Sequence, residues 1–119
     1  MIAVGVILRA EQVAIGLAGI AVYLAVGGSW LLLVPLLLAF DLSMVGYLAG
    51  ARIGSITYNA AHNLVIALLA LGIGWWAGLD WLQLLGALWL AHVAFDRALG
   101  YGLKLPSDFR DTHLGRIGR

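Results

Sequence analysis

The chain contains no cysteine, which excludes disulfides and thiolate metal sites. Charged residues are also scarce, at 11% of the 119 residues, whereas an average soluble domain has about 25%. No basic stripe with interleaved aromatic residues is present, which argues against a nucleic-acid partner. Instead, 63% of the residues are hydrophobic, and the mean hydropathy is +1.00. One small domain cannot bury this much apolar surface, so we expect lipid to be its main solvent.

Four apolar segments, each near the roughly 20 residues of a membrane span, predict four transmembrane helices. The connections between them are short, so neighbouring helices must be antiparallel. The N-terminal apolar run has no basic segment before it and is interpreted as part of the first helix, not as a signal peptide. We therefore predict an all-α integral membrane protein, a four-helix transmembrane bundle over residues 1–102. The helices are expected at about 3–26, 30–48, 55–77 and 81–99.

Residues 103–119 are predicted to form a cytoplasmic tail. Within it, Ser107 is a candidate cap for a short amphipathic helix containing Phe109, Leu114 and Ile117. Pairs of small residues in the apolar segments predict close helix packing. These are Gly16 with Gly19, Gly46 with Gly50 and Gly54, and Gly74 with Gly78.

Basic and aromatic residues predict the orientation. All seven Lys and Arg residues fall toward the face that carries the N-terminus, the 50–54 connection and the tail. By the positive-inside rule this face is cytoplasmic, so we expect a bacterial inner-membrane protein with both termini in the cytoplasm. The opposite face has an aromatic belt at the helix ends, formed by Trp30, Trp75, Trp76 and Trp81.

Five ionisable residues interrupt the apolar segments: Glu11, Asp41, His62, His92 and Asp96. With a rise of 1.5 Å per residue, all five lie about 6 to 14 Å from the cytoplasmic face. His92 and Asp96 share a helix face because they are four residues apart, and so do Tyr58 and His62. Ionisable groups inside membrane helices are costly and usually functional. The sequence therefore predicts one buried polar site in the cytoplasmic leaflet.

Four polar stretches also carry a family resemblance. They are Asp41-Leu-Ser-Met-Val-Gly-Tyr47, Tyr58-Asn-x2-His62, His92-x2-Phe-Asp-Arg97 with Gly100-Tyr-Gly-Leu-Lys104, and Asp111-Thr-His-Leu-Gly-Arg116. In these stretches the chain resembles the small bacterial membrane proteins grouped as domain of unknown function 4260. The resemblance covers nearly the whole chain, including the Leu8-Arg-Ala-Glu11 start. It implies a compact multi-helix membrane domain with this set of polar motifs, and it implies no activity.

Imidazole and carboxylate groups together suit a divalent metal such as Zn, Mn or Fe. The candidate ligands are His62, His92, Asp96 and Asp41, with His113 as a further ligand if the tail folds back under the bundle. Such a metal lowers the pKa of a coordinated water toward neutrality. Two other interpretations stay open. One is a polar core in which histidines and aspartates satisfy each other, and the other is a metal-free acid–base cluster.

We interpret the chain as an intramembrane enzyme, a metal-assisted hydrolase or an acid–base catalyst acting on a lipid-like molecule. Arg97 and Arg9 are candidates to hold the substrate headgroup. The alternative is a proton-coupled transporter or carrier, which would have to be a homo-oligomer because the polar cluster occupies only one leaflet. A second alternative is a structural membrane subunit without chemistry. The candidate catalytic residues are Glu11, Asp41, Tyr58, His62, His92 and Asp96.

Overall fold

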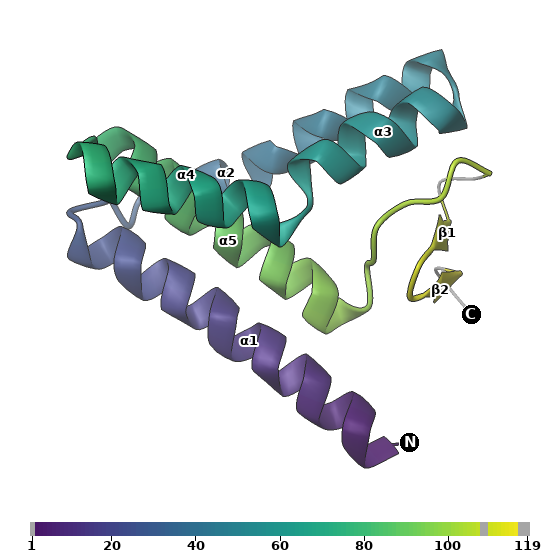
Figure 1. The fold of residues 1–119 in the computed structure, drawn as a ribbon, viewed down its shortest axis with the longest axis horizontal. Coiled ribbons are helices and arrows are strands. Elements are labelled where there is room, and N and C mark those ends of the chain that lie inside the picture. Colours follow the sequence, from purple (N-terminus) through teal and green to yellow (C-terminus); the bar gives the residue numbers. More distant parts are fainter. Residues whose placement is uncertain (1, 108–109, 117–119) are drawn as a thin grey trace.

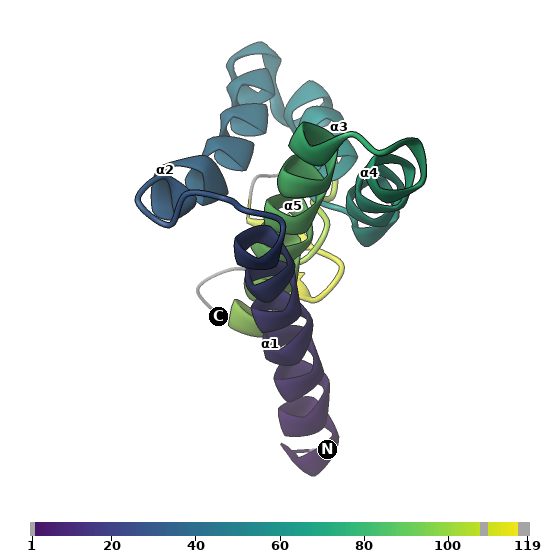
Figure 2. The same ribbon diagram turned by 90° about the vertical axis from the view of Figure 1, so that its left-hand side faces the viewer.

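The computed structural model describes residues 2–107 and 110–116 (Figures 1 and 2). The fold is all-α except for a small hairpin in the tail, which confirms the all-α part of the prediction. In chain order the elements are α1 (Ile2–Ala25), α2 (Leu33–Leu38), the 3-10 helix η1 (Ala39–Ala49), α3 (Ala51–Ala61), α4 (Leu64–Ala77), α5 (Asp80–Leu99), β1 (Asp111–Thr112) and β2 (Gly115–Arg116).

Helix α5 lies at the centre and packs against both α1 and α4, whereas η1 and α3 pack against each other (Figure 1). The η1–α3 pair projects away from α1, so the helices form a splayed arrangement around α5 (Figures 1 and 2). Small residues permit the close contacts. A Cβ atom added at Gly19 would lie 2.6 Å from the Ala87 carbonyl oxygen, and one at Gly16 would lie 2.6 Å from the Phe95 ring.

The other predicted small-residue contacts divide into two kinds. Gly46 and Gly54 do pack closely across the η1–α3 pair, against Thr57 and Tyr47. Gly50 instead has a φ of +113° and lies at the junction of η1 with α3. This region of φ is open to glycine but costly for other residues, so this glycine serves the turn and not the helix contact.

The segment predicted as one helix over 30–48 is two elements, α2 followed by η1. A 3-10 stretch of 11 residues is unusually long. Three backbone carbonyls here accept side-chain hydrogen bonds: Leu37 from His92, Phe40 from Ser43, and Ser43 from Thr57. These acceptors compete with the regular α-helical pattern, which gives a physical reason for the tighter winding.

The helix predicted over 55–77 is also divided, because the chain leaves helical geometry at His62 and Asn63. Asn63 is extended, with φ −124° and ψ 148°, and its side chain accepts a hydrogen bond from the Ile66 amide. It is therefore the N-cap of α4, a role that asparagine favours. Side chains of α5 hold the end of α3: Arg97 donates to the His62 carbonyl at 3.0 Å, and Trp89 donates to the Ala61 carbonyl.

In the tail, the described residues form a short antiparallel hairpin of β1 and β2, not the predicted amphipathic helix. Gly115 has a φ of +114°, which a helix cannot contain. Leu114 is exposed beside this turn, and an isolated bridge joins Lys104 to Thr112. Phe109 and Ile117, which were expected on the apolar face of that helix, lie outside the described residues.

Much of the described surface is hydrocarbon. Large apolar side chains such as Leu31, Leu48 and Trp76 are 77%, 89% and 82% exposed. Two helical stretches, Ala3–Ala25 and Ala51–Ala77, are long and apolar enough to cross a membrane. The second of these includes the break at His62.

The contact between α1 and α5 generates a prediction about stability. Gly19→Leu should destabilise the protein by about 2 kcal/mol or more, because the new side chain meets the α5 backbone and must push the helices apart. Thermal unfolding in detergent measures the effect. Gly72→Leu is the matched control, since a Cβ atom there meets nothing within 4 Å. Equal melting temperatures for the two variants would contradict the assigned packing.

Candidate metal site

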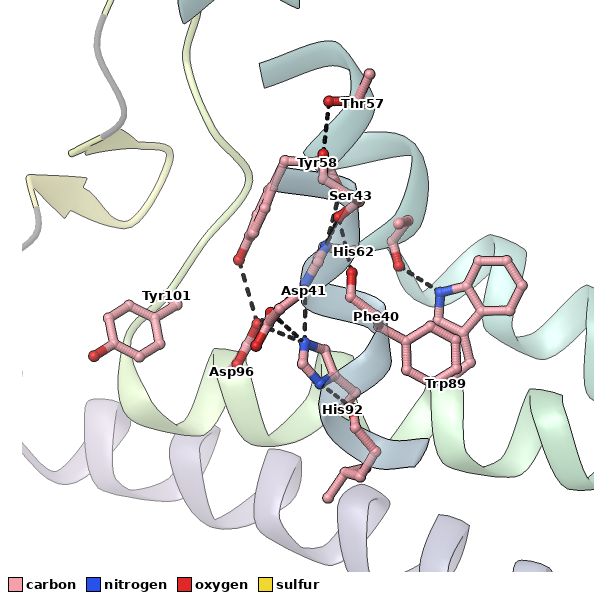
Figure 3. Close-up of polar contacts among 12 residues, drawn as sticks. Phe40, Asp41, Ser43, Thr57, Tyr58, His62, Trp89, His92, Asp96 and Tyr101 are labelled. Atoms are coloured by element: carbon pink, nitrogen blue, oxygen red, sulfur yellow. Dashed lines mark hydrogen bonds and ion pairs between the residues drawn. The ribbon is translucent and has the colours of Figure 1, made fainter. Parts of the chain in front are cut away.

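Four ionisable side chains converge near the middle of the molecule (Figure 3). Asp41 comes from η1, His62 follows the last turn of α3, and His92 and Asp96 lie one turn apart on α5. One potential ligand atom from each of the four lies within 4.8 Å of the others. These residues, distant in the sequence, therefore converge as predicted. Only α5 is a long regular helix, however, because Asp41 comes from a 3-10 helix and His62 from the end of a short helix.

Backbone carbonyls determine which nitrogen of each histidine carries the proton. His92 Nδ1 lies 2.7 Å from the Leu37 carbonyl oxygen, and His62 Nδ1 lies 3.0 Å from the Tyr58 carbonyl oxygen. A carbonyl can only accept, so both Nδ1 atoms must donate. Ser43 agrees, because its hydroxyl donates to Phe40 and can only accept from His62 Nδ1, 3.3 Å away. Each neutral imidazole therefore presents a lone pair at Nε2.

The two Nε2 atoms face each other at 2.9 Å (Figure 3). Two lone pairs at this distance repel, and the carboxylates of Asp41 and Asp96 add negative charge beside them. His92 Nε2 lies 3.0 Å from Asp41 Oδ1 and 3.4 Å from Asp96 Oδ2. The arrangement therefore requires a positive charge at its centre, either a shared proton or a metal ion.

The spacing of the four groups is close to that around a small tetrahedral ion. Zinc bonds of about 2.0–2.2 Å place tetrahedral ligand atoms about 3.3–3.6 Å apart. Three of the five Nε2–Nε2 and Nε2–carboxylate separations, at 3.3, 3.4 and 3.6 Å, fall in this range, and the other two, at 2.9 and 3.0 Å, are shorter. Each histidine also donates its second nitrogen to a carbonyl, which is the usual outer support of a metal-bound imidazole. Asp41, His62, His92 and Asp96 could thus hold a metal.

The two carboxylates differ in their surroundings. Asp96 is 18% exposed, and its Oδ2 accepts a hydrogen bond from the Tyr58 hydroxyl at 3.2 Å. Asp41 is 42% exposed. Tyr58 also stacks on His62, with ring centroids 3.8 Å apart. Asp96 is therefore the fixed carboxylate of the pair, and Asp41 is the one that meets solvent or a second molecule.

Aromatic rings close the other side of the cluster. Phe40 stacks on Trp89 at 5.3 Å and lies 5.7 Å from the His92 ring (Figure 3). Both residues were missed as part of the site by the sequence interpretation. Trp89 did offer a signal, because it lies within the predicted helix over 81–99, while the other tryptophans fall at helix ends.

The tail covers Tyr58 from the side of α3. The Asn59 amide donates to the Lys104 carbonyl at 2.8 Å and accepts from the Lys104 amide at 2.6 Å. This pair of bonds holds Lys104 at 3% exposure, with its ammonium 4.9 Å from the Tyr58 ring. Burial lowers the pKa of Lys104, while the Asp96 carboxylate opposes that shift. The tail thus packs against the support of the cluster, and no side chain among its described residues joins the four ligand groups.

Two predicted site residues lie outside the cluster. Glu11 is exposed on α1, because the stripe of α1 that contacts α5 runs through Gly16 and Gly19, and position 11 is turned away from it. The tail does not deliver His113 as a ligand. Its Nδ1 accepts a hydrogen bond from the Leu103 amide at 2.8 Å, so that lone pair is already used within the tail.

The predicted headgroup residues Arg9 and Arg97 line a separate pocket with His113. Arg97 donates to the backbone carbonyls of His62 and Tyr101 at 3.0 and 3.1 Å. Burial and the Arg97 guanidinium lower the pKa of His113, partly offset by its hydrogen bonding with Leu103.

Comparison with known proteins gives one match. The profile of a family described as domain of unknown function (DUF4260) matches residues 5–117. No curated protein and no solved structure matches the chain.

The docking of the tail can be tested at Asn59. Asn59→Ala removes both hydrogen bonds to Lys104, so tryptic cleavage at Lys104 and Arg110 in detergent should accelerate by about tenfold. Time-resolved proteolysis followed by mass spectrometry measures the rate. Asn63→Ala is the control, because it removes the cap of α4 but leaves the tail bonds. Equal cleavage rates in the two variants would show that Asn59 does not hold the tail.

Proposed function

The chain belongs to the family described as domain of unknown function (DUF4260), and from its site we propose that it is an integral membrane hydrolase that uses a divalent metal, with zinc preferred. The observation that carries this proposal is the convergence of Asp41, His62, His92 and Asp96, whose potential ligand atoms lie within 4.8 Å of one another around two facing Nε2 atoms. Manganese and iron fit less well, because they favour more ligands at longer distances.

A membrane location is supported by the exposed hydrocarbon of the described surface and by the two helical stretches of spanning length. We place the chain in the bacterial inner membrane, with the α1 start, the Gly50 turn and the tail on the cytoplasmic side. The distribution of Lys and Arg favours this orientation. The metal site then lies within the cytoplasmic leaflet, where a lipid-like substrate can reach it laterally.

The residues divide into a fixed set and an adjustable one. His62, His92 and Asp96 are held by the Tyr58 and Leu37 carbonyls and by the Tyr58 hydroxyl. A zinc ion bound there would polarise a substrate carbonyl or phosphoryl oxygen and activate water near neutral pH. If Asp41 is not a permanent ligand, these three residues would leave one position open, which is typical of catalytic zinc sites and not of structural ones.

Asp41 is the adjustable residue and the proposed general base. It is the most exposed of the four, and it lies on the 3-10 helix η1, a geometry that often marks a hinge. With a metal held by the other three residues, the Asp41 carboxylate would be the group that accepts a proton from the attacking water. Tyr58 remains a positioning residue in this scheme because its hydroxyl bonds to Asp96.

An apolar pocket beside the cluster suits the chain of a lipid-like substrate. Its volume is about 500 Å³, and Phe40, which contacts the His92 ring, forms one wall. A pocket of this size with few polar groups is typical of small-molecule sites. Its other walls include Tyr23, Leu32, Leu36, Trp81 and Leu88.

Metal content tests the first part of the proposal. The purified protein should contain about one zinc per chain, and His92→Ala should lose nearly all of it, because each ligand contributes strongly to affinity. Elemental analysis by mass spectrometry measures both. His113→Ala is the matched control and should keep its zinc, since His113 lies outside the cluster. A native protein without stoichiometric metal after zinc loading would leave only the shared proton.

Hydrolysis tests the second part. Metal-loaded protein in vesicles of phosphatidylglycerol and phosphatidylethanolamine should release cleavage products detectable by mass spectrometry. Asp41→Asn should slow the release by about 10²–10⁴-fold while keeping the metal, as expected for loss of a general base. Glu11→Gln removes a carboxylate outside the cluster and should have little effect. No release above that of metal-stripped protein would reject the hydrolase proposal, and loss of metal in Asp41→Asn would reassign Asp41 as a fixed ligand.

A further inference from the structure

A second pocket, distinct from the metal site, lies where α1 extends past the end of α5. On α1 one helical stripe contains Gly5, Leu8, Arg9 and Gln12, followed by the glycines that contact α5. Helix α5 stops at Gly100, so this first part of the stripe has no helical partner. The pocket of about 420 Å³ forms there, closed on the far side by His113 and Leu114 of the tail.

The charge of the pocket is unbalanced. Two guanidinium groups line it, from Arg9 and Arg97, and no carboxylate is among its described lining residues. The Asp96 carboxylate attracts the Arg97 guanidinium from outside the pocket, which leaves Arg9 as the less balanced charge. Glu11 is two residues from Arg9 on α1 and therefore points to a different face. Arg97 is fixed by its bonds to two backbone carbonyls, yet a guanidinium has five N–H donors and still offers several of them. An anion would be attracted here.

Gln12 adds an independent observation. Gln12 lines the pocket, and its Oε1 atom is buried and has no hydrogen-bond partner. A buried acceptor without a donor is costly. An occupant that supplies an O–H or N–H group would remove this cost. A ligand that fits this pocket therefore has acceptor oxygens for the two arginines and one hydrogen-bond donor for Gln12.

We propose that this pocket binds the headgroup of an anionic phospholipid that carries a free hydroxyl, as phosphatidylglycerol does. The phosphate oxygens accept hydrogen bonds from Arg9 and Arg97, a geometry that guanidinium groups favour. When the Gln12 amide turns toward the pocket, a headgroup hydroxyl donates to its Oε1 atom. The apolar rim of Leu8 and Leu114 accommodates the start of the acyl chains. The bound lipid bridges α1 and the tail.

Native mass spectrometry of the detergent-solubilised protein tests the proposal with phosphatidylglycerol and phosphatidylcholine as probes. The protein should bind phosphatidylglycerol at least about tenfold more tightly, and Arg9→Gln should remove most of this preference. Arg52→Gln is the matched control, with the same change of charge on the same side of the molecule but outside the pocket. If both variants lose the preference for phosphatidylglycerol equally, the preference comes from surface charge in general, and the proposal is overturned.

Two further measurements make the assignment specific. Gln12→Leu should weaken phosphatidylglycerol binding without a change of charge, and unchanged binding would contradict the role of the headgroup hydroxyl. Inorganic phosphate should fail to displace the lipid. Displacement at comparable concentrations would assign the pocket to a free phosphate ion and overturn the lipid source. None of these readouts requires metal or turnover, so they stand or fall separately from the hydrolase proposal.

Discussion

The facing Nε2 atoms of His62 and His92 are the constraint on which the rest of this structure depends. Their tautomers follow from the Leu37 and Tyr58 carbonyls, so neither ring can turn its proton toward the other without losing a buried hydrogen bond. The proposed metal ion, or a shared proton, would relieve the repulsion between them. The 3-10 winding of η1 and the break after α3 both serve this geometry, because each delivers one side chain or carbonyl to the same point.

The molecule is organised in two parts that meet at the cluster. Helices α1, α4 and α5 pack through small residues and form one part, and η1 with α3 forms the other (Figure 1). Asp41 and His62 come from the second part, and His92 and Asp96 from the first. An ion bound by all four would join the parts, so its binding energy would contribute to the fold as well as to the proposed chemistry.

The sequence predicted the helical class and the family, and it selected the four clustered residues by their similar depth. It could do so because both signals can be read directly from the sequence. The length of an apolar segment predicts a helix, and ionisable residues within such segments are rare. Glu11 shared the depth but not the helix face, because depth alone leaves the rotation of each helix undetermined.

The breaks within the second and third helices were not predicted, because their causes are tertiary. Trp89 and Arg97 donate hydrogen bonds to backbone carbonyls at the end of α3, and His92 donates one to the Leu37 carbonyl. Asn63 before an apolar run was a local signal for the second break. The tail hairpin had a similar signal in Gly115, whose positive φ suits a turn.

The order of the four residues along the chain has a consequence for biosynthesis. Asp41 and His62 emerge from the ribosome well before His92 and Asp96, which lie on the last helix. In the proposed membrane setting, the first two can pair with each other at 3.3 Å within the η1–α3 pair, but the set of four is complete only when α5 arrives. Maturation of the centre is then a late event, and a chain truncated before α5 leaves behind an unstable precursor that quality-control proteases can recognise.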